Sequence, residues 1–190
     1  MLLLVGLGNP GSNYTNTRHN IGFKIIDAIN AHFKLSKQKP KFKGLLTTGN
    51  IDEKKIYAIK PLTFMNNSGT AIKELIDYFK IDAKDVFVFH DDMDIDFGKI
   101  KAKFGGSSAG HNGIESIDKF IGKDYSRVRI GIGHPKQKKR VNNHVLDDFK
   151  EDEEDKIKEI TENIVKQIPT LIDKKIDLFS SKVNQNLNGI

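Results

Sequence analysis

The sequence predicts an α/β fold: a single-domain three-layer sandwich in which a mixed, mostly parallel twisted sheet lies between helices on both faces. Short apolar runs of strand length alternate along the chain with longer segments in which apolar residues recur every three or four positions, as they do in amphipathic helices. Such alternation is typical of sheets whose parallel strands are joined by helices. A length of 190 residues suits one domain, which we assign to residues 1–190.

The first half of the chain is expected to alternate between buried strands and amphipathic helices. Residues 34–43 include five lysines and one proline, a composition that suits an exposed connection. Short apolar runs ending in Gly-rich or polar turns predict the strands, and Ile21, Ile25 and Ile29 begin a stripe of helical spacing. The expected elements are strands at 2–7, 45–48 and 56–59 and helices at 20–33 and 67–79.

The second half continues the alternation and ends in a helical region. Residues 86–89 are β-branched and aromatic, which is typical of a buried strand. Residues 99–104 alternate charged and apolar side chains, as a half-exposed edge strand does. Residues 151–183 have helical periodicity interrupted by Pro169, so we expect a kink or two helices that pack on the rest of the domain. A helix at 112–121 and a strand at 128–132 complete the pattern.

Composition excludes several classes of protein. The chain has no cysteine, which excludes a disulfide scaffold, a thiolate zinc site and a cysteine nucleophile. No apolar run approaches the roughly 18 residues of a membrane-spanning helix, and the first residues lack the basic segment of a signal peptide. We therefore expect no membrane association.

The charge of the chain is distributed unevenly. The net charge is +6, which favours an anionic partner. Residues 147–190 have 7 basic and 11 acidic side chains, a net charge of −4, so residues 1–146 have a net charge of +10. The positive excess therefore belongs to the part of the chain that precedes the C-terminal helical region.

Two glycine-rich motifs match known patterns only in part. Gly6–Gly11 fits the G-x-G-x-x-G pattern of dinucleotide sites after a strand, but poor helix formers follow it where that site requires a helix. Gly106–Gly110 fits the G-x-S-x-G nucleophile elbow with Ser108 at its centre, but Gly110 and His111 separate the serine from the predicted helix. Both motifs favour loops over nucleotide binding or serine catalysis.

A third pattern imitates a calcium loop. Asp92, Asp94 and Asp96 alternate like the first ligands of such a loop, but Phe97 and Lys103 occupy the positions that require glycine and a bidentate glutamate. We therefore expect a polar turn after the strand.

Polar side chains gather where predicted strands end or helices begin. Histidine, carboxylate and amide groups of this kind suit activation of a water by histidine, with aspartate holding the imidazole and asparagine donating to an oxyanion. We expect such a site to cleave an activated ester more readily than an amide, since no residue here suits the formation of a covalent intermediate. The alternative is a structural histidine bonded to aspartate, which is common in proteins. Four polar clusters carry these groups, the second of which also includes two apolar residues: Asn9, Tyr14 and His19; Phe64, Met65 and Asn66; His90 and Asp91; and His111 and Asn112.

Six separate motifs of the chain resemble one enzyme family. GLGNPGSNYTNTRHNIGF, KPLTFMNNSG, FHDDMDI, GHNGIESI, RVRIGIGHP and NHVLDDF occur in this order over roughly residues 1–150. Together they resemble the bacterial-type peptidyl-tRNA hydrolases. The loop before GHNG has Ser108 and Ala109 where the family is usually richer in glycine, and the C-terminal tail matches the family less well.

The resemblance implies a function, a partner and a location. The family hydrolyses the ester that joins a peptide to the 3′ end of tRNA and so recycles tRNA from peptidyl-tRNA. The partner is then peptidyl-tRNA, with no metal and no cofactor. Family members are generally cytoplasmic monomers, and we expect the same here.

The resemblance also implies roles at the reacting ester. His19 would be the general base that activates water, and Asp91 would hold its imidazole and keep it basic. Asn9 would sense the blocked amino end of the peptidyl group and help the carbonyl to develop negative charge, although a turn residue beside proline is the alternative. Met65 would form a packing wall beside His19.

Further roles concern the tRNA end. Asn66 and Asn112 would contact the substrate near the ester, although Asn112 also suits the N-cap of its helix. Tyr14 and Phe64 would line the tRNA end, with ordinary packing as the alternative.

The last implied roles concern phosphate. Lys103 and Arg129 are where the family places its clamp for the tRNA 5′ phosphate, Arg129 as a bidentate donor and Lys103 as a point charge. A solvated edge-strand lysine is the alternative for Lys103. The basic loop at 136–140 lies within reach of the tRNA backbone. His90, His111, His134 and His144 are expected to be scaffold or surface residues.

Overall fold

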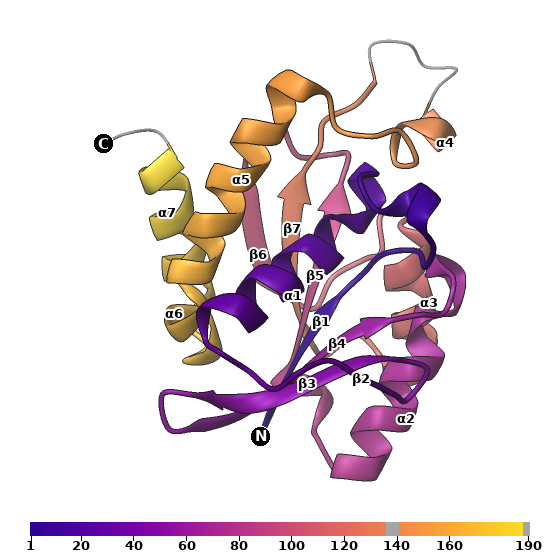
Figure 1. Cartoon of the computed structure of the whole chain (residues 1–190), viewed down its shortest axis with the longest axis vertical. Helices are drawn as coiled ribbons and strands as arrows, with labels where there is room; N and C mark the ends of the chain where they lie inside the picture. The colour runs from indigo at the N-terminus through magenta and orange to yellow at the C-terminus, as the bar shows by residue number, and fades with distance from the viewer. Residues whose placement is uncertain (136–140, 188–190) are drawn as a thin grey trace.

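A seven-stranded mixed sheet forms the centre of the protein (Figure 1). The computed structural model describes residues 1–135 and 141–187. The strand order is β2-β3-β4-β1-β5-β7-β6; β4, β1, β5 and β7 are mutually parallel, and the strands outside them run antiparallel to their neighbours. The strands are β1 (Leu2–Gly6), β2 (Lys39–Lys41), β3 (Gly44–Ile51), β4 (Lys54–Pro61), β5 (Val86–Asp92), β6 (Ile100–Phe104) and β7 (Ser126–Gly131).

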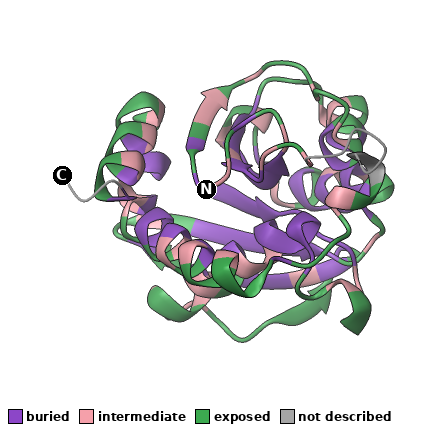
Figure 2. Cartoon of the chain, turned by 90° about the horizontal axis from the view of Figure 1, so that it is seen from above, coloured by how far each residue is buried: buried purple, intermediate pink, exposed green. Residues whose placement is uncertain are grey.

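Helices cover both faces of the sheet, which confirms the predicted α/β sandwich (Figure 2). One face carries α1, α5, α6 and α7, and the other carries α2 and α3. Short 3-10 turns, η1 (Ser12–Tyr14), η2 (Arg18–Asn20), η3 (Met65–Asn67) and η4 (Ala83–Asp85), lie in the connections. The α-helices are α1 (Ile21–His32), α2 (Ser68–Phe79), α3 (Asn112–Ile121), α4 (Val141–His144), α5 (Glu151–Lys166), α6 (Ile168–Ile172) and α7 (Ile176–Leu187).

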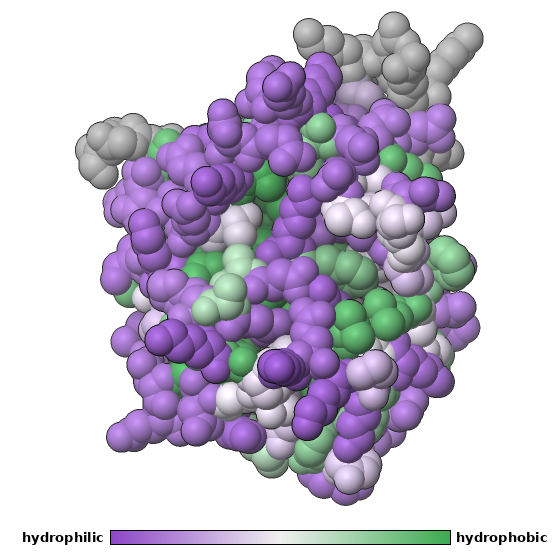
Figure 3. Space-filling view, viewed as in Figure 1, coloured by the Kyte–Doolittle hydropathy of each residue, from purple (hydrophilic) through white to green (hydrophobic). Residues whose placement is uncertain are grey.

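The apolar core has two halves because side chains alternate across each strand. In β1, Leu4 belongs to the cluster under α1 and α5, whereas Leu3 and Val5 belong to the cluster under α2 and α3. All three side chains are fully buried. The central strands are therefore apolar on both faces, as parallel strands between two helical layers are. The outer surface in the view of Figure 3 is mostly hydrophilic.

The start of α1 sits unusually close to the sheet. A Cβ atom at Gly22 would lie 2.3 Å from the backbone nitrogen of Leu7 and 2.5 Å from the carbonyl oxygen of Phe89, and one at Gly6 would lie 2.2 Å from the oxygen of Gly22. Only glycine fits at these two positions. This close contact brings η2, the turn that precedes α1, to the carboxyl ends of β1 and β5.

The C-terminal region forms three helices, α5, α6 and α7, whereas the sequence predicted a kink or two helices. Pro169 lies in the first turn of α6, where a proline ring is tolerated because the N–H it lacks would have no intrahelical partner. The helix α7 covers the edge strand β6. Asn184 accepts from the N–H of Ile100 (3.0 Å) and donates to its carbonyl (2.7 Å), and Ser180 accepts from the N–H of Ala102 (2.8 Å). These side chains bond backbone groups of β6 that a neighbouring strand would otherwise bond.

The edge of the sheet beyond β3 is formed by a short strand. The lysine-rich connection contains a short strand, β2, that the sequence did not predict; its three residues are all exposed, so no apolar alternation reveals it. Among the described residues, no helix is long and apolar enough to cross a membrane.

Candidate active site

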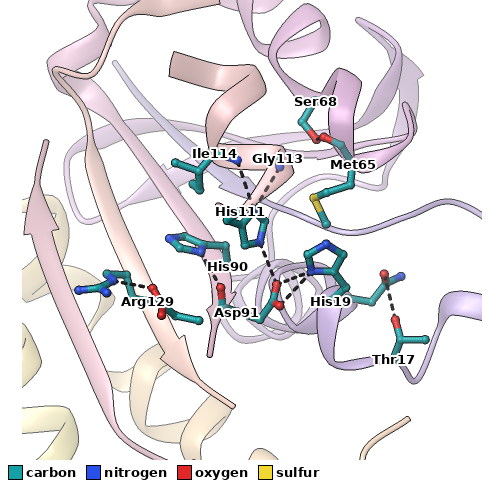
Figure 4. A network of polar contacts seen from close by, with 12 residues as sticks. Thr17, His19, Met65, Ser68, His90, Asp91, His111, Gly113, Ile114 and Arg129 are labelled. Carbon is teal, nitrogen blue, oxygen red and sulfur yellow. Dashed lines mark hydrogen bonds and ion pairs between the residues drawn. The ribbon is translucent and has the colours of Figure 1, made fainter. Parts of the chain in front are cut away.

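His19 and Asp91 form a buried hydrogen-bonded pair at the carboxyl end of the sheet (Figure 4). His19 lies in η2 and Asp91 near the end of β5. The Nδ1 atom of His19 is 2.8 Å from Oδ1 and 2.9 Å from Oδ2 of Asp91, and the two residues are 6% and 1% exposed. A carboxylate only accepts, so Nδ1 carries the proton and Nε2 is the basic nitrogen.

His111 is a second histidine on the same carboxylate. Its Nε2 lies 3.0 Å from Oδ1 of Asp91, and its Nδ1 accepts from the backbone N–H groups of Gly113 (3.1 Å) and Ile114 (3.3 Å). Since Nδ1 is an acceptor, Nε2 carries the proton and donates to Asp91. His111 is thus both the N-cap of α3 and a hydrogen-bond donor to the carboxylate.

Asp91 is held in its charged form by these partners. Burial alone raises the pKa of its carboxyl group, but the electrostatic attraction and the hydrogen bonds of the His19 and His111 N–H groups outweigh burial and hold the pKa well below its usual range. A permanent carboxylate is what fixes the tautomer of His19.

The structure sharpens one expectation here and corrects another. His111 was expected to be a scaffold or surface residue, yet it contacts the central carboxylate and lines the pocket. Asn112 was considered as the N-cap, but the cap is His111, and Asn112 is the first, exposed residue of α3. The signal was local: a histidine immediately before a predicted helix can cap it through Nδ1.

His90 has a different environment. Its Nδ1 donates to the backbone carbonyl of Asp91 (2.8 Å), and its ring centroid is 4.8 Å from that of His111. Burial lowers the pKa of His90 well below its usual range, so it is neutral. This environment supports the scaffold interpretation of His90.

Asn9 is oriented by three hydrogen bonds. Its backbone N–H donates to Oδ1 of Asn20 (2.9 Å), and its carbonyl accepts from Nδ2 of Asn20 (3.0 Å). Its side-chain Oδ1 accepts from the N–H of Met65 (2.9 Å). With Oδ1 engaged, the Nδ2 group of Asn9 has no partner among the described residues and is available as a donor. Asn20 directly follows His19, so one turn positions both residues.

Met65 packs against the start of α3. Its side chain is buried, and its Sδ atom would lie 2.5 Å from a Cβ atom at Gly113. Met65 therefore joins η3, which holds Asn9, to the turn that carries His111.

A pocket of about 190 Å³ opens over this cluster. Its lining includes His19, Asp91, His111 and Asn112. Asn9 instead lines a separate groove, together with Pro10 and Asn20. His19 and Asn20, which follow each other in the chain, line the pocket and the groove respectively.

Most of the residues predicted to contact the tRNA end are exposed. Phe64 is 58% exposed, Asn66 and Asn112 are exposed, and Tyr14 is half-buried. The amide groups of Asn66 and Asn112 have no hydrogen-bond partner within the described part of the chain. They are free to contact a ligand.

Arg129 and Lys103 lie on the same face of the sheet, on neighbouring strands. In the β6–β7 register, Arg129 is opposite Lys101, and Lys103 is opposite Arg127, so Arg129 and Lys103 are diagonal neighbours. Burial, followed by the charges of Arg129 and Arg127, lowers the pKa of Lys103. The basic loop at 136–140 lies outside the described residues.

Comparison with known proteins identifies the family of this chain. The family model for peptidyl-tRNA hydrolase matches residues 3–189. The chain belongs to this family. Peptidyl-tRNA hydrolase of Pelagibacter ubique is 73% identical over 97% of this chain and 99% of its own length, and that of Ehrlichia ruminantium is 46% identical over 95% and 93%. The solved peptidyl-tRNA hydrolase of Acinetobacter baumannii is 34% identical, with a TM-score of 0.90 over 97% of this chain and 94% of that chain.

Membership in the peptidyl-tRNA hydrolase family confirms the predicted family and the predicted enzyme class, a hydrolase. The family match also extends through the C-terminal helices, beyond the motifs at residues 1–150 that carried the resemblance. The solved structure shares the sandwich of helices and mixed sheet.

The three discounted motifs have structural explanations within this peptidyl-tRNA hydrolase fold. Gly6–Gly11 leads into the 3-10 turn η1 and not into an α-helix. Ser108 lies in a loop that ends before α3 begins. Asp92 is hydrogen-bonded to Arg129 (2.7 Å), and Asp94 is hydrogen-bonded to His134 (2.9 Å). None of these arrangements has the geometry that its motif requires.

One group of side chains has the composition of a metal site. Ligand atoms of His19, Asp91 and His111 lie within 4.8 Å of one another, the one such group among the described residues. However, the Nε2 atom of His111 carries a proton because its Nδ1 accepts two backbone N–H groups. The contacts are therefore those of a hydrogen-bonded triad.

Proposed function

We propose that this protein hydrolyses the ester between a peptide and the 3′ end of tRNA through a water that His19 activates. The observation that carries this proposal is the buried His19–Asp91 pair, which leaves the basic Nε2 of His19 without a partner among the described residues. A histidine with one nitrogen fixed by a carboxylate is a general base in the correct tautomer.

The proposed reaction needs no covalent intermediate. Nε2 of His19 takes a proton from water, and the hydroxide attacks the ester carbonyl. The Nδ2 group of Asn9 donates to the oxyanion as it forms. The tetrahedral intermediate collapses, the imidazolium returns its proton to the ribose oxygen, and tRNA leaves with its hydroxyl restored.

The remaining residues are assigned to the tRNA. Tyr14 and Phe64 stack on or line the 3′ end, and Asn66 and Asn112 contact the substrate near the ester; their exposure and free polar groups support this assignment. Lys103 and Arg129 bind the 5′ phosphate of tRNA. We further propose that the protein acts as a monomer in the cytoplasm.

Two other classes of function make different predictions. A non-catalytic RNA-binding protein on the same fold would bind tRNA without releasing peptide, but such a protein does not need a base with an orienting carboxylate. A dinucleotide enzyme would show saturable NAD binding, and we expect none because η1 follows the glycine-rich loop.

The deciding experiment compares wild type with His19→Ala on an N-blocked aminoacyl-tRNA such as diacetyl-lysyl-tRNA. General base catalysis is worth roughly 10²–10⁴-fold, so we expect at least such a loss in the rate of peptide release, with tRNA binding retained. The matched control is His32→Ala, an exposed histidine at the far end of α1. Near-normal release by His19→Ala would refute the assignment, and loss of activity in Ser108→Ala would favour a serine nucleophile.

A further inference from the structure

The carboxylate of Asp92 is fixed between Arg129 and the backbone. Its Oδ2 accepts from Nε of Arg129 at 2.7 Å, and its Oδ1 accepts from the N–H of Asp94 at 2.9 Å. Asp92 is 8% exposed. With both oxygens engaged and little solvent access, this carboxylate has one orientation. Figure 4 shows Arg129 on the opposite side of Asp91 from His19.

The two arginines of β7 use their guanidinium groups differently. Arg127 is 1% exposed, and both of its terminal nitrogens are engaged, with the carbonyl of Ser107 (2.6 Å) and with Asp118 (2.7 Å). Arg129 has a side chain that is 19% exposed, and within the described residues its only hydrogen bond is made by Nε. Its two terminal nitrogens therefore remain as a fork with a fixed direction, the geometry that grips a phosphate bidentately.

Positive charge exceeds negative charge around this fork. Lys101 lies directly opposite Arg129 in the strand register, and Lys103 is its diagonal neighbour. Of these three cations, Arg129 alone is paired with a carboxylate, that of Asp92, within the described residues, whereas Arg127 is balanced by Asp118. An additional anion on this face would complete the charge balance.

We propose that Asp92 is a positioning residue that makes this fork selective for a terminal phosphate over the phosphodiesters of the RNA backbone. The inference rests on the proposed function, because it assumes that tRNA presents its 5′ end to Arg129. By holding Nε, Asp92 directs the terminal nitrogens outward toward the exposed oxygens of a monophosphate. By cancelling one positive charge, it weakens the attraction for singly charged diesters, which offer fewer free oxygens.

Removing Asp92 is then expected to separate affinity from selectivity. In Asp92→Asn, the cations gain attraction for any phosphate while Arg129 loses its fixed direction. Deacylated tRNA with a 5′ hydroxyl should bind more tightly. The ratio of its Kd to the Kd of deacylated tRNA with a 5′ phosphate should fall. We expect a ratio of roughly tenfold or more in wild type, the size of one charge-assisted hydrogen bond, and about threefold or less in the variant. A purely structural role would not tighten binding.

Matched variants isolate the contact. Asp94→Asn makes the same charge change two residues away, on a carboxylate that pairs with His134, and should keep the wild-type ratio. Arg129→Lys keeps the charge but lacks Nε, so it should lower the ratio by itself. In the Arg129→Lys background, Asp92→Asn should lower the ratio no further.

The outcomes are distinguishable. An unchanged ratio in Asp92→Asn, an equal loss in Asp94→Asn, or a wild-type ratio near one would overturn the role of Asp92. If Asp92→Asn does not fold, Arg129→Lys tests the same contact, because it also removes the hydrogen bond between Nε and Asp92. A wild-type ratio of the two Kd values in Arg129→Lys would then overturn the role of Asp92. Absence of peptide release by wild type would overturn the proposed function, while the binding ratio, which needs no hydrolysis, would still decide the inference.

Discussion

The imidazoles of His19 and His111 converge on one carboxylate oxygen, Oδ1 of Asp91, at 2.8 Å and 3.0 Å, with ring centroids 4.8 Å apart. Two N–H donors on one buried carboxylate keep it charged and fix its plane. His111 is itself fixed, because the first N–H groups of α3 donate to its other nitrogen. The orientation of His19 therefore depends on a helix cap.

This relationship predicts that His111 contributes to catalysis and stability through different atoms. In His111→Asn, the side-chain oxygen still caps α3 but no longer donates to Asp91. Stability should stay within about 1 kcal/mol of wild type because asparagine is a good N-cap, while kcat should fall about tenfold, the value of one charge-assisted hydrogen bond. His111→Ala should lose both. Equal kcat values for His111→Asn and wild type would show that the contact with Asp91 is incidental.

A second prediction concerns Asn20, which holds the backbone of Asn9. Asn20→Ala removes the two hydrogen bonds to the backbone of Asn9, each worth about 0.5–1.5 kcal/mol, and a longer one from Oγ1 of Thr17 (3.5 Å). The substitution thereby frees the turn that directs Nδ2 of Asn9. We expect lower stability and a kcat reduced by about tenfold or more in the peptide-release assay. Asn30→Ala is the control, since Asn30 lies further along α1 and accepts from Thr47 (2.8 Å). It should lower stability without changing kcat.

A third prediction is a pH dependence of stability that originates from His90. Burial lowers the pKa of His90 in the folded protein well below the value of about 6.5 in the unfolded chain. Below about pH 6.5 the unfolded chain therefore binds a proton that the folded protein does not, and stability falls as pH falls, by at most about 1.4 kcal/mol per pH unit. The free energy of unfolding, measured with denaturant at several values between pH 5 and 7, should depend less steeply on pH in His90→Asn than in wild type. The exposed control His32→Asn should keep the wild-type slope.

A fourth prediction follows from the net charge of +10 in residues 1–146. Affinity for tRNA should fall steeply with salt, because each neutralised phosphate releases counterions and adds about −0.7 to −0.9 to the slope of log K against log salt. Arg129→Gln should reduce the magnitude of this slope by about one. Lys84→Ala is the control, since Lys84 pairs with Asp82 before the amino end of β5. A flat response in wild type would indicate that the charge serves only solubility.

Local patterns in the sequence were sufficient for most of the fold. Period and composition located β5 and α3, and Pro169 marked the break in the C-terminal helices. They missed β2 because its exposed residues have no apolar alternation and it exists only by pairing with β3. The order of the motifs identified the family, and the resemblance to that family made His19 and Asp91 candidate catalytic residues.

What the tertiary structure alone decided is which side chains meet. His111 reaches Asp91 across 20 residues of sequence, and Arg129 reaches Asp92 across 37. Likewise, the partner of Arg129 on the next strand is Lys101, because the β6–β7 register places Lys103 opposite Arg127. Such contacts follow from strand order and register, which long-range packing sets. The sequence by itself determined the elements and the chemical groups at their ends; the packing of α1 and α3 on opposite faces of one sheet decided that those groups share a carboxylate.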